Sequence, residues 1–193
     1  MRFQIFIAIL LLSQISCVQT DSSIYIKKIG WTIKVPKGFK IDDSATMTLN
    51  KSRGRKLFEN TLNKKINDSA LETLISITKD HFNHMISELD NSNLINKQNW
   101  ELSDKTSKGT LLKSLQNLLT NVQIDTLNTI DTIAGVKFKR LQMVFKLPND
   151  MIMFYNQLNT FYNNHSWGIT YIYSDKDAGT EIEKALKSSI LDK

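Results

Sequence analysis

The sequence predicts a single α+β domain in which a twisted antiparallel sheet carries helices on both faces, a three-layer α/β/α sandwich. Residues 124–173 have the pattern of successive strands joined by short turns, which is typical of an antiparallel meander. Helical patterns precede these strands and another follows them. Residues 151–155 (MIMFY) are apolar in both strand phases, as expected for a strand that is covered on both sides.

The first half of residues 24–193 is expected to mix short strands with helices. Two strands, residues 24–26 and 31–35, come first, and Pro36 and Gly38 end the second of them. Apolar residues at strand or helix spacing then predict four further elements. These are a helix over residues 51–66, a strand over 71–77, a short helix over 82–89 capped by Asp80, and a helix over 108–122 with Leu111, Leu112, Leu115, Leu118, Leu119 and Val122 on one face.

The second half is expected to be richer in strands. The predicted strands are residues 124–133, 136–147, 151–162 and 167–173. The apolar phase changes within residues 136–147, which favours a bulge near residues 139–140. Asp175 is expected to begin a final helix, whose buried side consists of Ile182, Ala185, Leu186 and Ile190.

The first 16 residues have the pattern of a signal peptide. Arg2 precedes an apolar run over residues 3–12, which has the length of a signal-peptide core and is too short to span a membrane as a helix. We therefore expect residues 1–16 to direct export and to be removed by cleavage.

Cys17 is the only cysteine in the chain. Residues 12–17 (LSQISC) resemble a bacterial lipobox, although Gln14 stands where a leucine is usual. We expect Cys17 to be the lipidated first residue of the mature chain, followed by a polar tether that ends at residue 23. An ordinary signal peptide with an incidental cysteine is the alternative. A single cysteine excludes an intramolecular disulfide and a Cys–Cys redox pair.

The chain is basic, with a formal net charge of +6. Its lysines are scattered, except for a denser stretch at residues 51–56 (KSRGRK). Such a stretch could lie against anionic lipid headgroups or be the solvated start of a helix. We expect no nucleic-acid partner for an exported chain. The length of residues 24–193 suits one domain that is stabilised by its own core.

Several short motifs resemble those of the PsbP-like fold, which the photosystem extrinsic protein shares with the bacterial lipoprotein DcrB. The resembling segments are residues 30–39 (GWTIKVPKGF), residues 133–138 (IAGVKF) and residues 167–173 (WGITYIY) followed by a helix. The resemblance implies a PsbP/DcrB-like α/β/α sandwich over residues 24–193. It also implies a binding or accessory module, and it transfers no active site.

Candidate chemistry is sparse. His84 lies within the predicted helix 82–89 and His81 directly precedes it, so the two side chains would be about one turn apart. Asp80 or His165 could then complete a metal site. The alternative is a helix cap with two histidines that face solvent. The chain has no Gly-x-Ser-x-Gly turn and no glycine-rich phosphate loop. We therefore expect no cofactor.

Aromatic residues gather in two neighbouring predicted strands. They could line a face that holds an apolar ligand or a protein partner, or they could be core pairs that face each other across the sheet. The candidate face consists of Phe154, Tyr155, Trp167, Tyr171 and Tyr173.

These observations predict an exported, lipid-anchored accessory or binding protein of the bacterial cell envelope that faces the periplasm or the exterior and is not an enzyme. A metal-dependent enzyme that uses His81 and His84 is the main alternative, and an envelope stress or immunity-type protein is a third. Three Asn-x-Ser sequons, at Asn50, Asn67 and Asn164, would matter only in a host that glycosylates them.

Overall fold

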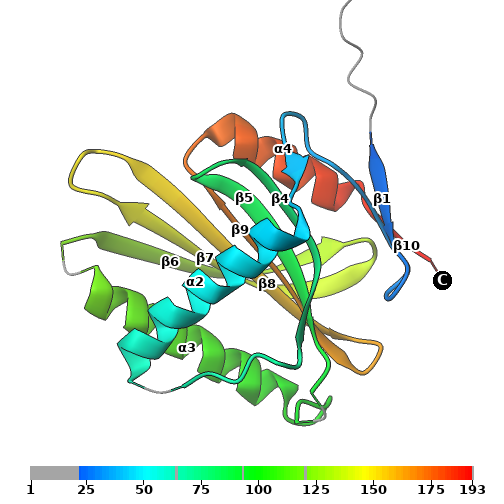
Figure 1. Cartoon of the computed structure of the whole chain (residues 1–193), viewed down its shortest axis with the longest axis horizontal. Helices are drawn as coiled ribbons and strands as arrows, with labels where there is room; N and C mark the ends of the chain where they lie inside the picture. Colours follow the sequence, from blue (N-terminus) through cyan, green and yellow to red (C-terminus); the bar gives the residue numbers. More distant parts are fainter. Residues whose placement is uncertain (1–21, 64, 93, 120, 193) are drawn as a thin grey trace, which may run out of the picture.

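The computed structural model describes residues 22–63, 65–92, 94–119 and 121–192, which form ten strands and three helices in two antiparallel sheets (Figure 1). The small sheet has the order β1-β2-β10 and consists of β1 (Ser23–Ile26), β2 (Trp31–Lys34) and β10 (Ile190–Leu191). The large sheet has the order β3-β4-β5-β9-β8-β7-β6 and consists of β3 (Lys40–Ile41), β4 (Leu71–Asp80), β5 (Asn83–Asp90), β6 (Gln123–Ile133), β7 (Val136–Lys146), β8 (Ile152–Tyr162) and β9 (His165–Tyr173). The helices are α2 (Ser44–Leu62), α3 (Trp100–Leu118) and α4 (Lys176–Lys187).

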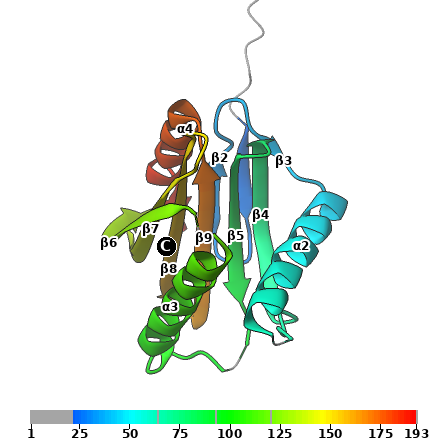
Figure 2. The ribbon, with the colours of Figure 1, turned by 90° about the vertical axis from the view of Figure 1, so that its left-hand side faces the viewer.

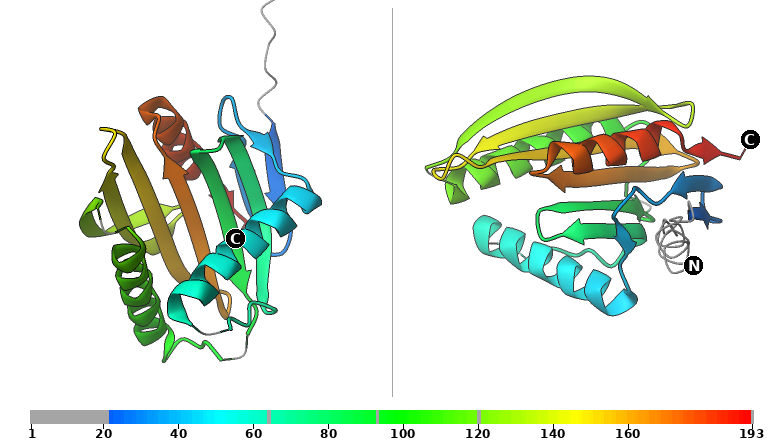
Figure 3. Two further views of the ribbon diagram at one scale, coloured as in Figure 1. Left: turned by 60° about the vertical axis from the view of Figure 1, so that its left-hand side comes forward. Right: turned by 90° about the horizontal axis from the view of Figure 1, so that it is seen from above.

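Helices lie on both faces of the large sheet. Figure 2 shows α2 and α3 in front of the strands, and the view from above in Figure 3 places α2 and α4 on opposite sides of them. The small sheet packs on the same face as α4, because its side chains share one core with those of α4. We call this face the α4 face and the opposite one the α2/α3 face. The predicted antiparallel sheet with helices on both faces is therefore confirmed.

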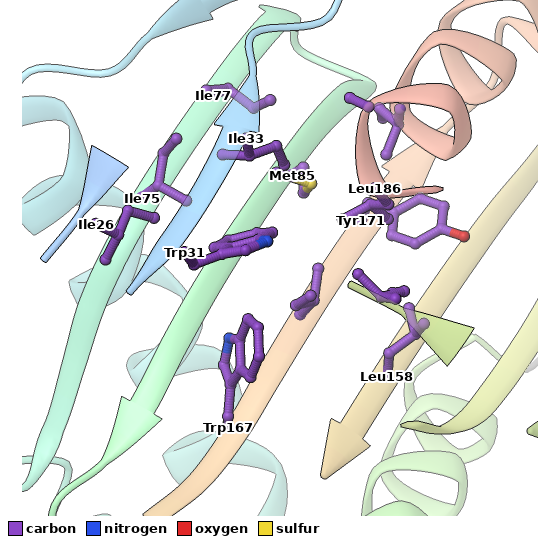
Figure 4. Close-up of a cluster of buried hydrophobic side chains, with 14 of the residues drawn as sticks. Ile26, Trp31, Ile33, Ile75, Ile77, Met85, Leu158, Trp167, Tyr171 and Leu186 are labelled. Atoms are coloured by element: carbon purple, nitrogen blue, oxygen red, sulfur yellow. The ribbon is translucent and has the colours of Figure 1, made fainter. Parts of the chain in front are cut away.

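The main core lies on the α4 face (Figure 4). Trp31 of β2 and Phe138 of β7 both pack edge-on against Trp167 of β9, with ring centroids 5.1 and 5.0 Å apart. Trp167 donates a hydrogen bond from its indole nitrogen to Ser87 Oγ at 2.8 Å. Ile182 of α4 is buried in the same core. Aromatic packing of this kind stabilises the centre of the sheet beyond the burial of apolar area.

A second, smaller core lies on the α2/α3 face, where Leu111 of α3 packs on Leu141, Met143 and Phe145 of β7. Strand β7 therefore buries residues of both phases, since Phe138 faces the opposite core. The predicted bulge near residues 139–140 is wrong, because β7 pairs with β6 and β8 through this region without a register shift. Burial on two faces accounts for the change of apolar phase.

The predicted helix over residues 82–89 is also wrong, because these residues form most of β5. Met85 and Leu89 are four residues apart, a spacing that fits one face of a helix and also one face of a strand. Asp80 accepts hydrogen bonds from the backbone nitrogen of Phe82 at 2.9 Å and from the side chain of Asn83 at 2.8 Å. It thus closes the hairpin turn between β4 and β5 instead of capping a helix.

Two helices begin earlier than their apolar patterns predicted. Helix α2 begins at Ser44, because Asp43 accepts a hydrogen bond from the backbone nitrogen of Thr46 at 2.7 Å and caps the helix there. Helix α3 begins at Trp100 and ends at Leu118. Leu118 was expected in the buried stripe of α3 but is 44% exposed.

The final helix, α4, confirms the cap predicted at Asp175, whose side chain accepts from the backbone nitrogen of Asp177 at 2.9 Å. Ile182, Ala185 and Leu186 are buried as predicted. Ile190 is 63% exposed, because the helix ends at Lys187 and Ile190 belongs to β10.

The predicted signal peptide (residues 1–16), Cys17 and most of the predicted tether (residues 17–23) lie outside the described residues, which begin at Ser22. Of the helices formed by the described residues, none has the length and apolar character needed to span a bilayer.

Candidate functional site

The five aromatic residues of the candidate face do not share one face of the sheet. Trp167 and Tyr171 are fully buried in the main core, which is the alternative interpretation given above. Phe154 and Tyr173 stack on each other beside α4, with ring centroids 4.8 Å apart. Tyr155 lies on the α2/α3 face, packed against the smaller core.

A charged network that the sequence pattern did not indicate lies between α4 and the sheet. Arg140 of β7, whose side chain is 13% exposed, donates to Asp131 at 2.9 Å, to Glu183 at 2.8 Å and from Nε to Asn156 Oδ1 at 3.0 Å. Tyr171 donates its hydroxyl to Glu183. Burial raises the pKa of Tyr171, and the neighbouring Glu183 carboxylate adds to that shift. Since its charges are paired with one another, the network joins β6, β7 and α4 and serves the fold.

The α2/α3 face has a cleft between its two helices. A hollow of about 310 Å³ lies under α3, and another of about 630 Å³ lies under α2. Both are lined by Leu71, Ile86 and Glu88, so they lie side by side, and we call the two together the α2/α3 cleft. In Figure 2 strands β5 and β9, which contribute its floor, are visible between α2 and α3.

The floor of the cleft under α3 is polar although it is formed by the central strands of the sheet. Glu88 of β5 is mostly buried there, and this burial raises the pKa of its carboxyl group. Gln157 of β8 has a buried Oε1 with no hydrogen-bond donor among the described residues. Asp104 of α3 is 8% exposed and accepts from Asn159 Nδ2 at 2.7 Å and Lys108 Nζ at 3.0 Å.

Two neighbouring residues shape this floor. Gly168 of β9 leaves room for Asn159, because a Cβ atom at Gly168 would lie 3.2 Å from Asn159 Oδ1. Tyr155 is partly buried beside the floor, and its burial raises its pKa to about 12, with Glu88 contributing in the same direction. Tyr155 therefore remains a neutral hydrogen-bonding group at any physiological pH.

His81 and His84 lie at the α2 end of the cleft. They do not share a helix, because His81 is in the β4–β5 turn and His84 is in β5. Burial lowers the pKa of His84, which favours its neutral form. The described residues contain no group of three or more histidine, cysteine, aspartate or glutamate side chains that could hold a metal ion. The helical spacing on which the metal interpretation depended is therefore incorrect.

A larger hollow, of about 900 Å³, lies between α3 and the edge strand β6. Its principal charges pair locally, since Lys108 binds Asp104 at 3.0 Å and Lys139 binds Glu101 at 2.9 Å.

No protein-family model and no curated protein matches this sequence. A solved structure with a similar fold is that of the cyanobacterial PsbP (CyanoP) from Synechocystis sp. PCC 6803, with a TM-score of 0.52 and 9% sequence identity. The match covers 89% of this chain and 92% of that one. At this identity the similarity establishes the fold and nothing further. The chain thus has the PsbP-like fold that its short sequence motifs predicted.

Proposed function

We propose that the chain is an exported, lipid-anchored binding or accessory protein of the bacterial cell envelope, and that it binds its ligand in the α2/α3 cleft. The observation that carries the binding role is the contrast between the two faces of the central strands. On the α4 face these strands are covered by a close-packed aromatic core. On the α2/α3 face the same strands line a hollow with Glu88 and Gln157, whose buried Oε1 has no donor among the described residues. Sites of this size with a few convergent polar groups commonly bind small molecules.

The arrangement of the cleft favours binding over catalysis. Two hydroxyl groups that line the same hollow as His84, those of Ser76 and Thr78, both donate to Asp42, at 2.6 and 3.0 Å. They are therefore not activated by His84, the residue that faces the same hollow. We infer that the cleft holds its ligand without forming or breaking covalent bonds.

Export and anchoring rest on residues 1–17 and can be tested separately from binding. Cells fed a radiolabelled or alkyne-tagged fatty acid should incorporate the label into wild type and not into Cys17→Ala. The Cys17→Ala chain should still leave the cytoplasm, since its apolar run at residues 3–12 is unchanged. Label that survives in Cys17→Ala would refute the anchor, and retention of both chains in the cytoplasm would refute export.

Binding in the cleft can be tested by native mass spectrometry of the protein purified from its own envelope. Wild type should retain a small molecule, and Ser107→Trp should lose it, because Ser107 lines the hollow under α3. Thr180→Trp is the matched control, since Thr180 is exposed on α4 and lies on the opposite side of the sheet. A wild-type chain that carries no ligand, or equal retention by both variants, would contradict the proposed site.

A further inference from the structure

The part of the α2/α3 cleft under α3 has an acidic lining in a basic protein. The chain has 25 lysine and arginine residues against 19 aspartate and glutamate residues. Nevertheless, the described residues that line this hollow include the carboxylates of Glu88, Asp90 and Asp104 and no lysine, arginine or histidine. The charge of this lining is therefore opposite in sign to the net charge of the chain, and the hollow attracts positively charged groups.

Two of the three carboxylates have no ion-pair partner in the described part of the chain. Among the ion pairs of the described residues, Lys108 pairs with Asp104, whereas Glu88 and Asp90 take part in none. The charge of Lys51 on α2 acts on Glu88 from a distance, but the ammonium group donates to the backbone oxygen of Leu71 at 2.7 Å. Glu88 itself accepts only a long hydrogen bond from Thr73 Oγ1, at 3.4 Å, among the described residues. Negative charge in a mostly buried hollow is costly unless an opposite charge is supplied.

The hollow also has one hydrogen-bond acceptor without a donor. Gln157 lines the hollow, and its Oε1 atom is buried and has no donor in the described part of the chain. An unpaired buried acceptor destabilises the protein, so a donor group of a ligand would be favoured there. Trp100 forms part of the wall, and its indole ring already holds the ammonium group of Lys139 at 5.1 Å from the ring centroid. The lining therefore offers carboxylates and an amide oxygen, which together suit a cation that donates hydrogen bonds.

We propose that this half of the cleft binds a small organic cation that carries amine groups, such as a linear diamine or an amino sugar. The hollow of about 310 Å³ is at the small end of ligand sites, which span about 300–1,000 Å³. A metal ion does not suit it, because the described carboxylates are not grouped closely enough to hold one. The proposal rests on the binding role proposed above and is independent of the lipid anchor.

Isothermal titration calorimetry at pH 7 and low salt tests this proposal on the mature chain with Cys17→Ser. The buried core residues of the described part of the chain lie between Ile26 and Leu186, so the mature chain retains all of them. Two matched pairs of probes separate charge from shape: putrescine against 1,4-butanediol, and glucosamine against glucose. At least one amine should bind with 1:1 stoichiometry, while its neutral counterpart and calcium chloride should give no binding heat.

A pair of variants locates the site. Glu88→Gln should weaken binding of the amine by about tenfold or more, the loss of one charge-assisted hydrogen bond. Glu181→Gln should leave binding unchanged, because Glu181 pairs with Lys184 on α4, on the other side of the sheet. Both variants should melt as a single folded species, which shows that any loss is local.

Several results would overturn the proposal. They are the absence of binding by both amines, equal binding by a neutral counterpart, binding of calcium in their place, and unchanged affinity in Glu88→Gln. If the protein purified from its envelope carries a ligand but neither amine binds, the amine class is wrong and the binding role stands. If neither experiment detects a ligand, the binding role fails as well.

Discussion

Replacement of Gly179 by alanine tests the packing between α4 and the sheet directly. A Cβ atom at Gly179 would lie 2.6, 2.7 and 2.8 Å from the Cε2, Cδ2 and Cζ atoms of the Tyr173 ring. The ring has little room to withdraw, because it is stacked against Phe154 at 4.8 Å and lies 6.2 Å from the ring of Tyr171. The added methyl group must therefore displace either α4 or the aromatic stack.

The magnitude follows from two opposing terms. Overpacking a well-packed site costs about 1–3 kcal/mol. Alanine in a helix interior is favoured over glycine by about 1 kcal/mol. Gly109 of α3 provides the matched control, because a Cβ atom there would meet nothing within 4 Å. Both variants receive the same helix term, so Gly109→Ala should be more stable than Gly179→Ala by about 1–3 kcal/mol, the overpacking term alone.

Urea unfolding followed by tryptophan fluorescence and by circular dichroism measures this difference. We expect Gly109→Ala to unfold at a higher urea concentration than wild type and Gly179→Ala to unfold at a lower one. Equal stabilisation of the two variants would refute the argument, since it would mean that Tyr173 can turn away from α4 without loss. A changed slope of the transition in Gly179→Ala would indicate instead that α4 detaches before the rest unfolds.

Three further substitutions probe other parts of the structure. Arg140→Met should lower the free energy of unfolding, measured in urea, by about 3 kcal/mol, because it leaves the partly buried carboxylates of Asp131 and Glu183 without their partner. A loss below about 1 kcal/mol would contradict a stabilising network. Ser87→Ala should lower the free energy of unfolding by about 1–3 kcal/mol, since it leaves the buried indole N–H of Trp167 without an acceptor. A variant as stable as wild type would argue against that hydrogen bond. Glu88 has a raised pKa in the folded state, so its carboxyl group lowers stability as the pH rises above the pKa of the unfolded chain. Glu88→Gln should accordingly match wild type in urea at pH 4 and exceed it at pH 7, and the same difference at both pH values would show that burial of the charge is not responsible.

Local patterns in the sequence predicted the C-terminal half of the fold well. Residues 167–173 alternate apolar and polar residues, and strand β9 buries Trp167, Ile169 and Tyr171 as that period requires. The cap at Asp175 and the buried side of α4 were also predictable, because a helix cap and an apolar stripe are local features. The same patterns failed at β5, where the spacing of Met85 and Leu89 fits a helix as well as a strand.

Patterns along the sequence could not predict the residues of the candidate site. Glu88, Asp104 and Gln157 lie on β5, α3 and β8, and no spacing along the chain relates them. The aromatic residues that the sequence did single out separate onto opposite faces, because adjacent residues of a strand such as Phe154 and Tyr155 must point in opposite directions.

The sequence by itself determined the strand and helix periods, the short PsbP-like motifs and an N-terminus with the pattern of an export signal. These are properties of neighbouring residues, so a single chain is enough to display them. The tertiary structure decided which face of each strand is closed by a core and which is left open, since that depends on where α2, α3 and α4 pack. The acidic hollow under α3 exists because elements far apart in the sequence bring Glu88, Asp104 and Gln157 together over the central sheet.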